Sequence, residues 1–484
     1  MTNVPFPMLT TPGQHTMVSG GRLINCYPEP LSATAGLPYA YWRVAGLSAW
    51  GTAPSGLYRG GIVVKGTFYA IFGTTLYSFT SLGGAGTALT GTTIAGTGFC
   101  WLSANQAVTP DIVIVSPGSA VYWTAFGSST VGPYPDVNVT NFGIPNCVTY
   151  ITGYFVFTVA SGTTFVSAIN GTAINLLNFA TAQSKPDALY RPMPLGSGGQ
   201  ILLIGSSTIE VWGSPINSTG YPFSYVSTIY RGVVNAGAIA GDEDGWGKGI
   251  FFVGDDNKVS TLTTYTPTPI SIPDLDQLIE REPDKTKVSV GVYVARGHGM
   301  VVVQGPSWCW EYDTTLQSWH ERQSYSGTYW RGYAPRYAFA QWICGDFPLA
   351  AGATPSLFQV DPQARNEIGQ PLRMRVETGP LGAFPHTVRI NEINVYMTKG
   401  ASIATGHDPD ETNAQIEISC SRNSGQTWSN ARQVSIGPQG IMAYRARASI
   451  WGSANIEGVR WRFDESAGLN FAFMGADMET DVLR

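Results

Sequence analysis

Charged residues are scarce in this sequence. They make up 13% of its 484 residues, about half of the share that is usual in soluble domains. The formal net charge of −5 leaves no basic surface of the kind that grips nucleic acid or an anionic membrane. No uninterrupted apolar run reaches the roughly eighteen residues of a transmembrane helix, so we expect no such helix.

Cysteine and histidine are also few, and neither is spaced as a metal site. The six cysteines are scattered without a Cys-x-x-Cys pair, which favours free thiols over a disulfide framework or a zinc site. No two histidines are spaced as His-x-x-x-His, and we expect all five in loops or on the surface. They are His15, His298, His320, His386 and His407. We therefore predict no metal, no cofactor and no catalytic residues.

Glycine, proline and aromatic residues are abundant instead, and the glycines follow a repeat. Seven pairs of apolar segments turn at or near a glycine, at intervals of 43 to 51 residues. The glycines are Gly73, Gly118, Gly162, Gly205, Gly254, Gly305 and Gly352. A period in the forties with paired strands in each unit is typical of four-stranded propeller blades. Continuous apolar runs such as 112–115 and 301–303 suit strands that neighbouring blades cover on both faces.

These patterns predict an all-β fold in three parts. Residues 51–365 form a β-propeller of six or seven blades, because the first and last hairpins can combine in one closing blade. A short helix at 273–282 interrupts the repeat, with Pro273 in its first turn and Pro283 after its end. Strands that alternate apolar and polar residues at 366–484 predict a C-terminal β-sandwich, jelly-roll-like domain. Residues 1–50 are expected to form an N-terminal arm or strap.

One segment resembles a motif of carbohydrate-cleaving propellers. The sequence SRNSGQTW at 421–428 nearly matches the Asp-box, Ser-x-Asp-x-Gly-x-Thr-Trp, with Asn423 in place of the aspartate. It is a single copy and lies outside the repeat. Since the box itself is a hairpin turn whose side chain bonds the backbone, we expect Asn423 to hold a turn and Trp428 to pack against it.

Other candidate side chains also favour structural interpretations. The acidic clusters Asp242–Asp244, Asp255–Asp256 and 408–411 lie beside glycine or proline, and we expect solvated turn carboxylates there. A Ca²⁺ loop at 242–244 is the alternative, although EF-hand spacing is absent. Trp308, Trp310, Tyr312 and Trp319 share one predicted hairpin, with Tyr329 and Trp330 close behind. Such aromatic residues can bind sugars, but we expect them to pack between blades.

Four segments in order carry a resemblance to a known family. They are RLINCYPEP with YWRVAGL (22–47), LLIGSSTIEVWGSPINSTG (202–220), SIPDLDQLIE with the hairpin through WCWEYDTTLQSWHE (271–321), and YWRGYAPRYAFAQWICGD with SLFQVD (329–361). Together with the repeat period they resemble the tail hub, or nozzle, proteins of short-tailed bacteriophages, the packaged-DNA stabilisation proteins. The resemblance covers about residues 20–365.

This resemblance implies a structural protein of the virion rather than an enzyme. Members of the family form a homo-hexameric ring in the phage tail, beneath the portal and its adaptor ring. The ring extends the DNA channel, retains the packaged genome until ejection, and docks the tail needle or plug and the tailspikes or fibres. DNA would pass through without sequence-specific binding, and the protein would be made in the cytoplasm of the host bacterium. The alternatives are a propeller glycosidase or depolymerase, or a lectin, acting on bacterial surface polysaccharide.

Overall fold

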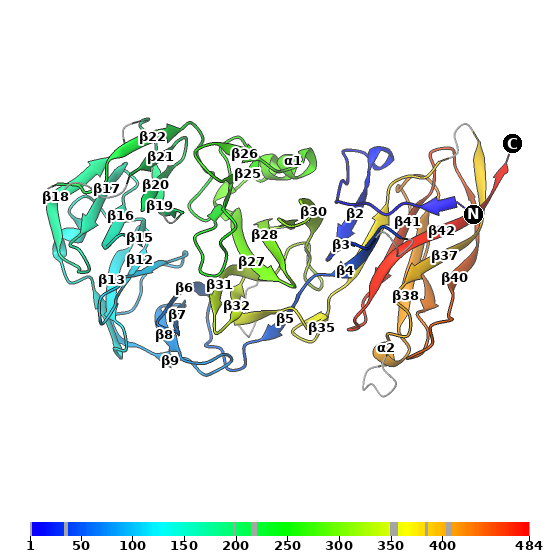
Figure 1. Cartoon of the computed structure of the whole chain (residues 1–484), viewed down its shortest axis with the longest axis horizontal. Helices are drawn as coiled ribbons and strands as arrows, with labels where there is room; N and C mark the ends of the chain where they lie inside the picture. The colour runs from blue at the N-terminus through cyan, green and yellow to red at the C-terminus, as the bar shows by residue number, and fades with distance from the viewer. Residues whose placement is uncertain are drawn as a thin grey trace.

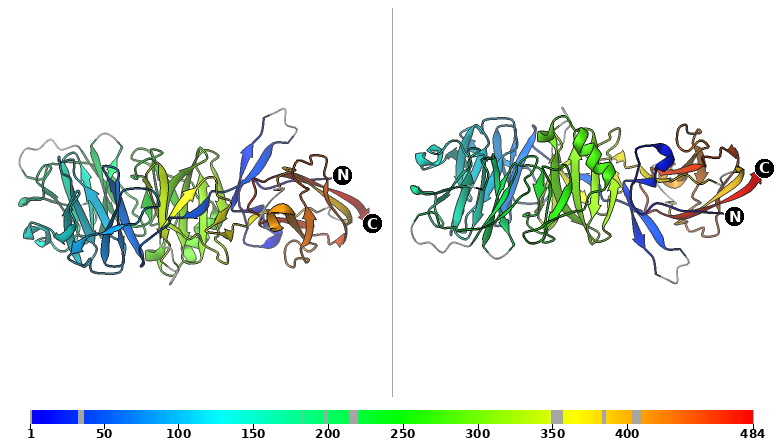
Figure 2. Two further views of the ribbon diagram at one scale, coloured as in Figure 1. Left: turned by 90° about the horizontal axis from the view of Figure 1, so that it is seen from below. Right: turned by 90° about the horizontal axis from the view of Figure 1, so that it is seen from above.

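The chain folds into a β-propeller and a β-sandwich that lie side by side (Figure 1). The structure, a computed structural model, describes residues 2–32, 37–182, 184–196, 199–213, 220–348, 357–382, 386–402 and 409–483. Figure 2 shows that the two parts make an elongated molecule, with both chain ends at the sandwich. None of the helices in the described ranges is long and apolar enough to cross a membrane.

The described residues form seven propeller blades, each built on four strands. Blades one to three contain β6 (Tyr58–Val64), β7 (Thr67–Phe72), β8 (Thr75–Phe79) and β9 (Thr87–Ala88); β11 (Trp101–Ala104), β12 (Asp111–Ser116), β13 (Ala120–Ala125) and β14 (Thr130–Pro133), with β10 (Thr90–Gly91) on its edge; and β15 (Cys147–Ile151), β16 (Tyr154–Thr158), β17 (Thr163–Ser167) and β18 (Ile174–Thr181). Blades four to six contain β19 (Leu189–Leu195), β20 (Gln200–Gly205), β21 (Ile209–Trp212) and β22 (Tyr225–Ile229); β23 (Ile239–Ala240), β24 (Ile250–Val253), β25 (Val259–Leu262) and β26 (Pro267–Pro269); and β27 (Ser289–Ala295), β28 (His298–Gly305), β29 (Trp308–Asp313) and β30 (Ser318–Glu321).

The seventh blade closes the ring with a strand from the start of the chain. It contains β31 (Gly332–Ala338), β32 (Gln341–Asp346), β33 (Leu357–Asp361) and β5 (Gly46–Ala49), and its sheet continues through β34 (Asn366–Glu367) and β35 (Gln370–Pro371). Because β5 pairs antiparallel with β33, the first and last parts of the propeller sequence share one sheet. Of the six or seven blades expected from the repeat, the structure has seven.

The glycine repeat marks the same hairpin in each blade, the one between its second and third strands. Six of the seven turns are described, and the turn near Gly352 lies outside the described residues. The apolar runs before these turns are buried as expected, for example Ile112 to Val115. Hydrophobic side chains fill the seams between neighbouring blades. The closing seam joins Phe72 and Phe79 of blade one to Ile343 and Leu357 of blade seven.

The helix expected at 273–282 is confirmed as α1 (Pro273–Arg281), with proline at its first position. Leu275 and Ile279 are fully buried in the core that blades five to seven share. The other helical elements are short: α2 (Pro409–Thr412), η1 (Thr16–Val18), η2 (Val137–Thr140) and η3 (Lys285–Lys287). Trp308, Trp310, Tyr312 and Trp319 lie in the same core, so their predicted packing role is confirmed.

The sandwich packs two sheets around a second core. One sheet contains β1 (Thr2–Val4), β3 (Cys26–Pro30), β4 (Tyr39–Arg43), β42 (Ala472–Leu483), β37 (Thr387–Met397) and β40 (Ala446–Ala454). The other contains β2 (Gly21–Ile24), β36 (Met374–Thr378), β41 (Arg460–Glu465), β38 (Gln415–Ser421) and β39 (Arg432–Ser435). The first fifty residues, expected to form an arm or strap, thus supply β1 to β4 to the sandwich and β5 to the propeller.

One sheet runs through both parts of the molecule. Strand β30, the last of blade six, pairs parallel with β2 of the sandwich through Glu321 and Ile24. The Asn25 amide also donates to the Glu321 carbonyl at 2.8 Å. Blade six and one face of the sandwich therefore form a continuous nine-stranded sheet.

Candidate functional site

The first strands of the blades surround a cavity on the propeller axis. Its volume is about 570 Å³, and its walls come from β6, β11, β15 and β19, from the loop after β23, and from β31. The loop carries Asp242, Glu243 and Asp244, while β19 and β31 carry Arg191 and Arg336. Ligands bind most often in concave sites, so this cavity is the candidate functional site of the propeller.

Two ion pairs lie at the base of this cavity. The Arg191 guanidinium donates to both carboxylate oxygens of Asp242 at 2.8 Å and lies 4.3 Å from the ring centroid of Trp101. Arg336 donates to Glu243 at 3.3 Å, and Glu243 also accepts the Gly241 amide at 2.7 Å. A smaller cavity on the other side is lined by Arg191, Glu243 and Arg336 as well. The ion pairs therefore form a layer that separates two axial cavities.

Burial changes the acid–base behaviour of this layer. Burial raises the pKa of Glu243, and the charge of Asp242 adds to that rise, while Arg336 and Arg191 oppose it. Burial alone would lower the pKa of Arg191, but the carboxylate of Asp242 outweighs it and the pKa is raised. Arg191 consequently stays charged, and the side chains of the layer tie blades four, five and seven together.

The expectation of solvated carboxylates at 242–244 is wrong for Glu243. Its side chain is 6% exposed, and that of Asp242 is 22% exposed, because both are turned toward arginines of other blades. Asp255 and Asp256 do match the expectation, since they share Arg231 at the surface, 3.0 and 3.4 Å away. In the third cluster, Asp408 lies outside the described residues, as does the side chain of Asp410.

Two histidines are also placed differently from the expectation. His298 and His320 lie buried on β28 and β30 instead of in loops. Carboxylates of the strand between them, β29, hold their rings: His298 Nδ1 lies 2.7 Å from Asp313, and His320 Nε2 lies 2.9 Å from Glu311. His15 and His386 are exposed, and His407 lies outside the described residues.

Glu311 is the centre of this buried network in blade six. It accepts the Tyr293 hydroxyl at 2.8 Å, and Arg322 lies 3.9 Å away. Burial by itself would raise the pKa of Glu311, but Arg322 and the His320 ring outweigh it, so the pKa is lowered. Arg322 also bonds Glu367 at 3.0 Å and the Ala45 carbonyl at 2.7 Å. The network therefore links blade six to the N-terminal segment and to β34.

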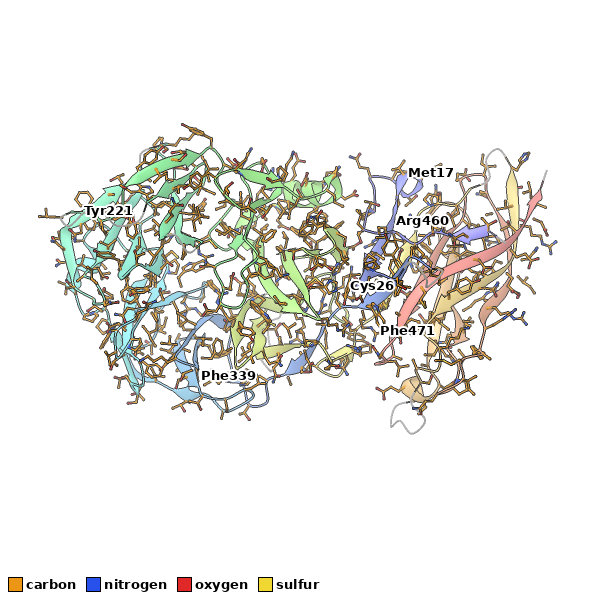
Figure 3. All side chains as sticks on the ribbon, in the orientation of Figure 1. Met17, Cys26, Tyr221, Phe339, Arg460 and Phe471 are labelled. Carbon is orange, nitrogen blue, oxygen red and sulfur yellow. The ribbon has the colours of Figure 1, made fainter. Side chains whose placement is uncertain are left out.

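Further ion pairs hold the sandwich to the propeller and to its own N-terminal strands. Arg22 of β2 donates two hydrogen bonds to Glu321 of β30, at 2.8 and 2.5 Å. Arg43 of β4 pairs with Glu465 of β41. Arg460 bonds Glu377 at 2.6 Å and the Ser19 hydroxyl at 3.1 Å. In Figure 3, Arg460 and Cys26 mark this side of the sandwich, which faces the propeller.

The Asp-box segment forms the hairpin turn expected of it. The Asn423 side-chain carbonyl accepts the Thr427 amide at 2.9 Å, and the Ser421 hydroxyl accepts the Gly425 amide at 2.7 Å. Trp428 stacks on the Arg462 guanidinium, which lies 3.9 Å from the centroid of its ring. The turn follows β38 in the sandwich, far from the axial cavity, so the motif marks a turn and not a catalytic centre.

The described residues contain no group of three or more His, Cys, Asp or Glu side chains placed to hold a metal ion. All six cysteines are buried and unpaired. Burial raises the pKa of the Cys147 thiol to about 12. Thiols of that kind are inert packing groups, because the thiolate is the reactive form.

The layer of ion pairs at the axis was not predicted from the sequence, although two of its residues occupy positions that could have indicated it. Arg191 and Arg336 each stand on the first strand of a repeat unit, and the first strands line a propeller axis. In a chain with so few charged residues, charged side chains on the first strands of repeat units indicate a cluster at the propeller axis.

Comparison with solved structures finds chains of low similarity. The WD40 β-propeller domain of Doa1 is 11% identical, covering 65% of this chain and 96% of its own, with a TM-score of 0.39. BamB from Moraxella catarrhalis is 11% identical, covering 68% and 94%, with a TM-score of 0.38. PorZ of Porphyromonas gingivalis is 11% identical, covering 73% and 45%, with a TM-score of 0.38. No curated protein matches the sequence.

A family model gives the assignment that these structures do not. Residues 23–351 match the model described as bacteriophage P22 Gp10, β-propeller. The matched span begins in β2, includes the strand β5 that closes the ring, and ends after β32, so it covers most of the propeller. The match extends over more than half of the chain, and the chain therefore belongs to the phage stabilisation family, a family of structural β-propeller proteins of the bacteriophage tail.

Proposed function

We propose that this chain is a subunit of a homo-hexameric ring in the tail of a short-tailed phage, beneath the portal and its adaptor ring. There it extends the path of the DNA, retains the packaged genome until ejection, and docks the needle or plug and the tailspikes or fibres. The observation that carries the proposal is the family match over residues 23–351.

The axial layer supports a particular version of this proposal. Arg191, Asp242, Glu243 and Arg336 are held in ion pairs, and Arg191, Glu243 and Arg336 line both axial cavities. DNA therefore has no path along the axis of a single subunit. In the proposed ring the path lies between subunits, around the axis of the ring.

The charge of the chain is compatible with such a path. Each phosphate that a protein neutralises adds salt-dependent affinity for DNA. A chain with 28 basic and 33 acidic residues offers little of that affinity, so DNA can slide past without being held.

Phage particles that lack this protein provide the test. We expect them to package DNA and then to lose it, so that full heads are present in the lysate and empty heads accumulate after purification. In parallel, the purified protein added to portal–adaptor complexes should appear in electron micrographs as a six-fold layer. Particles that keep full genomes without the protein would contradict the retention role, and absence of the layer would contradict the ring.

The axial cavity is the one observation that favours the alternative, a carbohydrate-cleaving or carbohydrate-binding propeller. Two carboxylates, Asp242 and Glu243, line it together with Trp101, and paired carboxylates are what glycosidases need. Each carboxylate, however, is held by an arginine. The assay is release of reducing sugars from the envelope polysaccharide of the host. If the wild-type protein releases them and Glu243→Gln does not, the alternative replaces our proposal.

A further inference from the structure

Ionisable residues are distributed very unevenly along the chain. Residues 66–184, which form most of blade one and all of blades two and three, contain two charged residues among 119, Asp111 and Asp136. Residues 366–484, a span of the same length that lies mostly in the sandwich, contain 24. Low charge is thus a property of one region of the molecule.

The two carboxylates of this region accept hydrogen bonds from other groups of the same region. Asp111 accepts hydrogen bonds from the Asn105 amide at 2.7 Å and the Trp123 indole at 2.8 Å. Asp136 caps η2 and accepts the Ile174 amide at 2.7 Å. Blades two and three therefore offer almost no free charge to a partner.

The outer edge of blade three is both uncharged and apolar. It is formed by β18, the last strand of the blade, and by the turn before it. Four large apolar side chains are exposed there: Ile169 at 66%, Leu176 at 37%, Leu177 at 75% and Phe179 at 45%. We refer to these four side chains with β18 as the blade-three edge. Figure 1 shows β18 at the end of the molecule opposite the sandwich.

The backbone presents the two leucines outward. Phe179 pairs with Phe165 and Ile174 pairs with Ser167, so residues 175–178 lie in a bulge without partners on β17. The Asn175 side chain accepts the Leu177 amide at 3.0 Å, which fixes the turn of the bulge. Beyond β18 no described strand pairs with the outer side of this sheet. An open strand edge with exposed leucines is unusual on a monomer, because it invites pairing with another chain.

We propose that the blade-three edge packs against a second copy of this chain. The proposal rests on the ring proposed above and names the surface through which its subunits meet. Nucleic acid and anionic lipid need basic side chains, and this region has none between Lys65 and Lys185. A charged protein surface would lose its hydration there without gaining an ion pair. The uncharged blades of a neighbouring copy match the edge in chemistry, and cores of permanent homo-oligomeric interfaces are depleted in charge in the same way.

The test uses one exposed leucine and a matched control. Leu177→Glu places a charge in the blade-three edge, and Ile450→Glu places one on β40 of the sandwich, where Ile450 is 79% exposed. Both side chains are exposed, so neither variant should change the melting temperature of the chain. In sedimentation velocity we expect the wild type and Ile450→Glu to associate alike. Leu177→Glu should raise the dissociation constant by roughly tenfold or more, since it replaces apolar burial with a buried charge.

Hydrogen exchange in intact phage particles covers the case in which association needs the other tail proteins. The amides of β18 should exchange more slowly in the particle than in the free chain. Equal association of wild type and Leu177→Glu would overturn the proposal, as would an equal defect in Ile450→Glu. A wild-type chain that stays monomeric, with β18 unprotected in the particle, would also overturn it, and so would protection by DNA or by a different tail protein. None of these results depends on genome retention, so failure of the interface and failure of the retention role are separate outcomes.

Discussion

Removing Asp242 should destabilise the propeller far more than removing a carboxylate from a surface ion pair. The Arg191 side chain is 6% exposed and has Asp242 as its acidic hydrogen-bond partner. Loss of one partner of a buried pair costs about 3–5 kcal/mol. Asp242 itself is 22% exposed, and Arg191 keeps its bond to the Ile239 carbonyl and its contact with Trp101. We therefore expect Asp242→Ala to lose about 3 kcal/mol, at the lower end of that range.

The matched control is Asp255→Ala. Arg231 and Asp255 are 34% and 35% exposed, and exposed pairs contribute about 0–1 kcal/mol. The double variant Arg191→Met/Asp242→Ala removes the stranded charge and keeps an apolar contact for Trp101, so it should recover about 2 kcal/mol of the loss. Urea unfolding followed by circular dichroism gives all the values. The reasoning is refuted if Asp242→Ala loses no more than Asp255→Ala, or if the double variant loses more than Asp242→Ala.

Three further predictions concern pH, the Asp-box turn and the closing seam. The lowered pKa of Glu311 means that its stabilising contribution is complete above its ordinary pKa of 4.5 and disappears as the pH falls below it. In urea titrations, the loss of unfolding free energy in Glu311→Gln relative to wild type should be large at pH 7 and should shrink below about pH 4.5. A loss that stays constant with pH would contradict the lowered pKa. Asn423→Ala should lose about 1 kcal/mol of unfolding free energy, measured by thermal unfolding, because the Thr427 amide loses its acceptor. Asn423→Asp keeps the acceptor and should stay within about 0.5 kcal/mol of wild type. Equal losses in the two variants would show that the side chain does not hold the turn. A Cβ at Gly345 would lie 2.1 Å from the ring of Tyr58, so Gly345→Ala should lower the unfolding free energy by about 1–3 kcal/mol. The control Gly98→Ala, with no neighbour within 4 Å, should leave it nearly unchanged. An unchanged unfolding free energy in Gly345→Ala would mean that the seam between blades seven and one adjusts to the extra methyl group at little cost.

The features that the sequence predicts well are local ones. Each glycine turn lies beside the strands it joins, so the hairpins from Gly73 to Gly305 and the helix from Pro273 could be recognised within short windows. The box at 421–428 could be interpreted from its own side chains, because Asn423 and Thr427 are four residues apart.

The features that the sequence did not predict depend on distant partners. Strand β5 closes the ring by pairing with β33, and its residues Gly46 and Leu47 face Asp361 and Val360. Arg191 and Asp242 are separated by 51 residues. A histidine such as His320 is buried because Glu311, on the next strand, accepts its hydrogen bond. For the charged residues and the histidine, the residue alone suggests a surface position, and only the folded neighbour makes burial favourable.

The nine-stranded sheet shared by blade six and the sandwich joins the two parts by backbone pairing. Bending there would break the pairing of β2 with β30 and separate Arg22 from Glu321. The angle between propeller and sandwich is thus held by backbone pairing and by an ion pair. In a ring of such subunits, the angle between propeller and sandwich would set how strongly the ring narrows along its axis. An opening that releases DNA would require each subunit to tilt as a whole body against its neighbours.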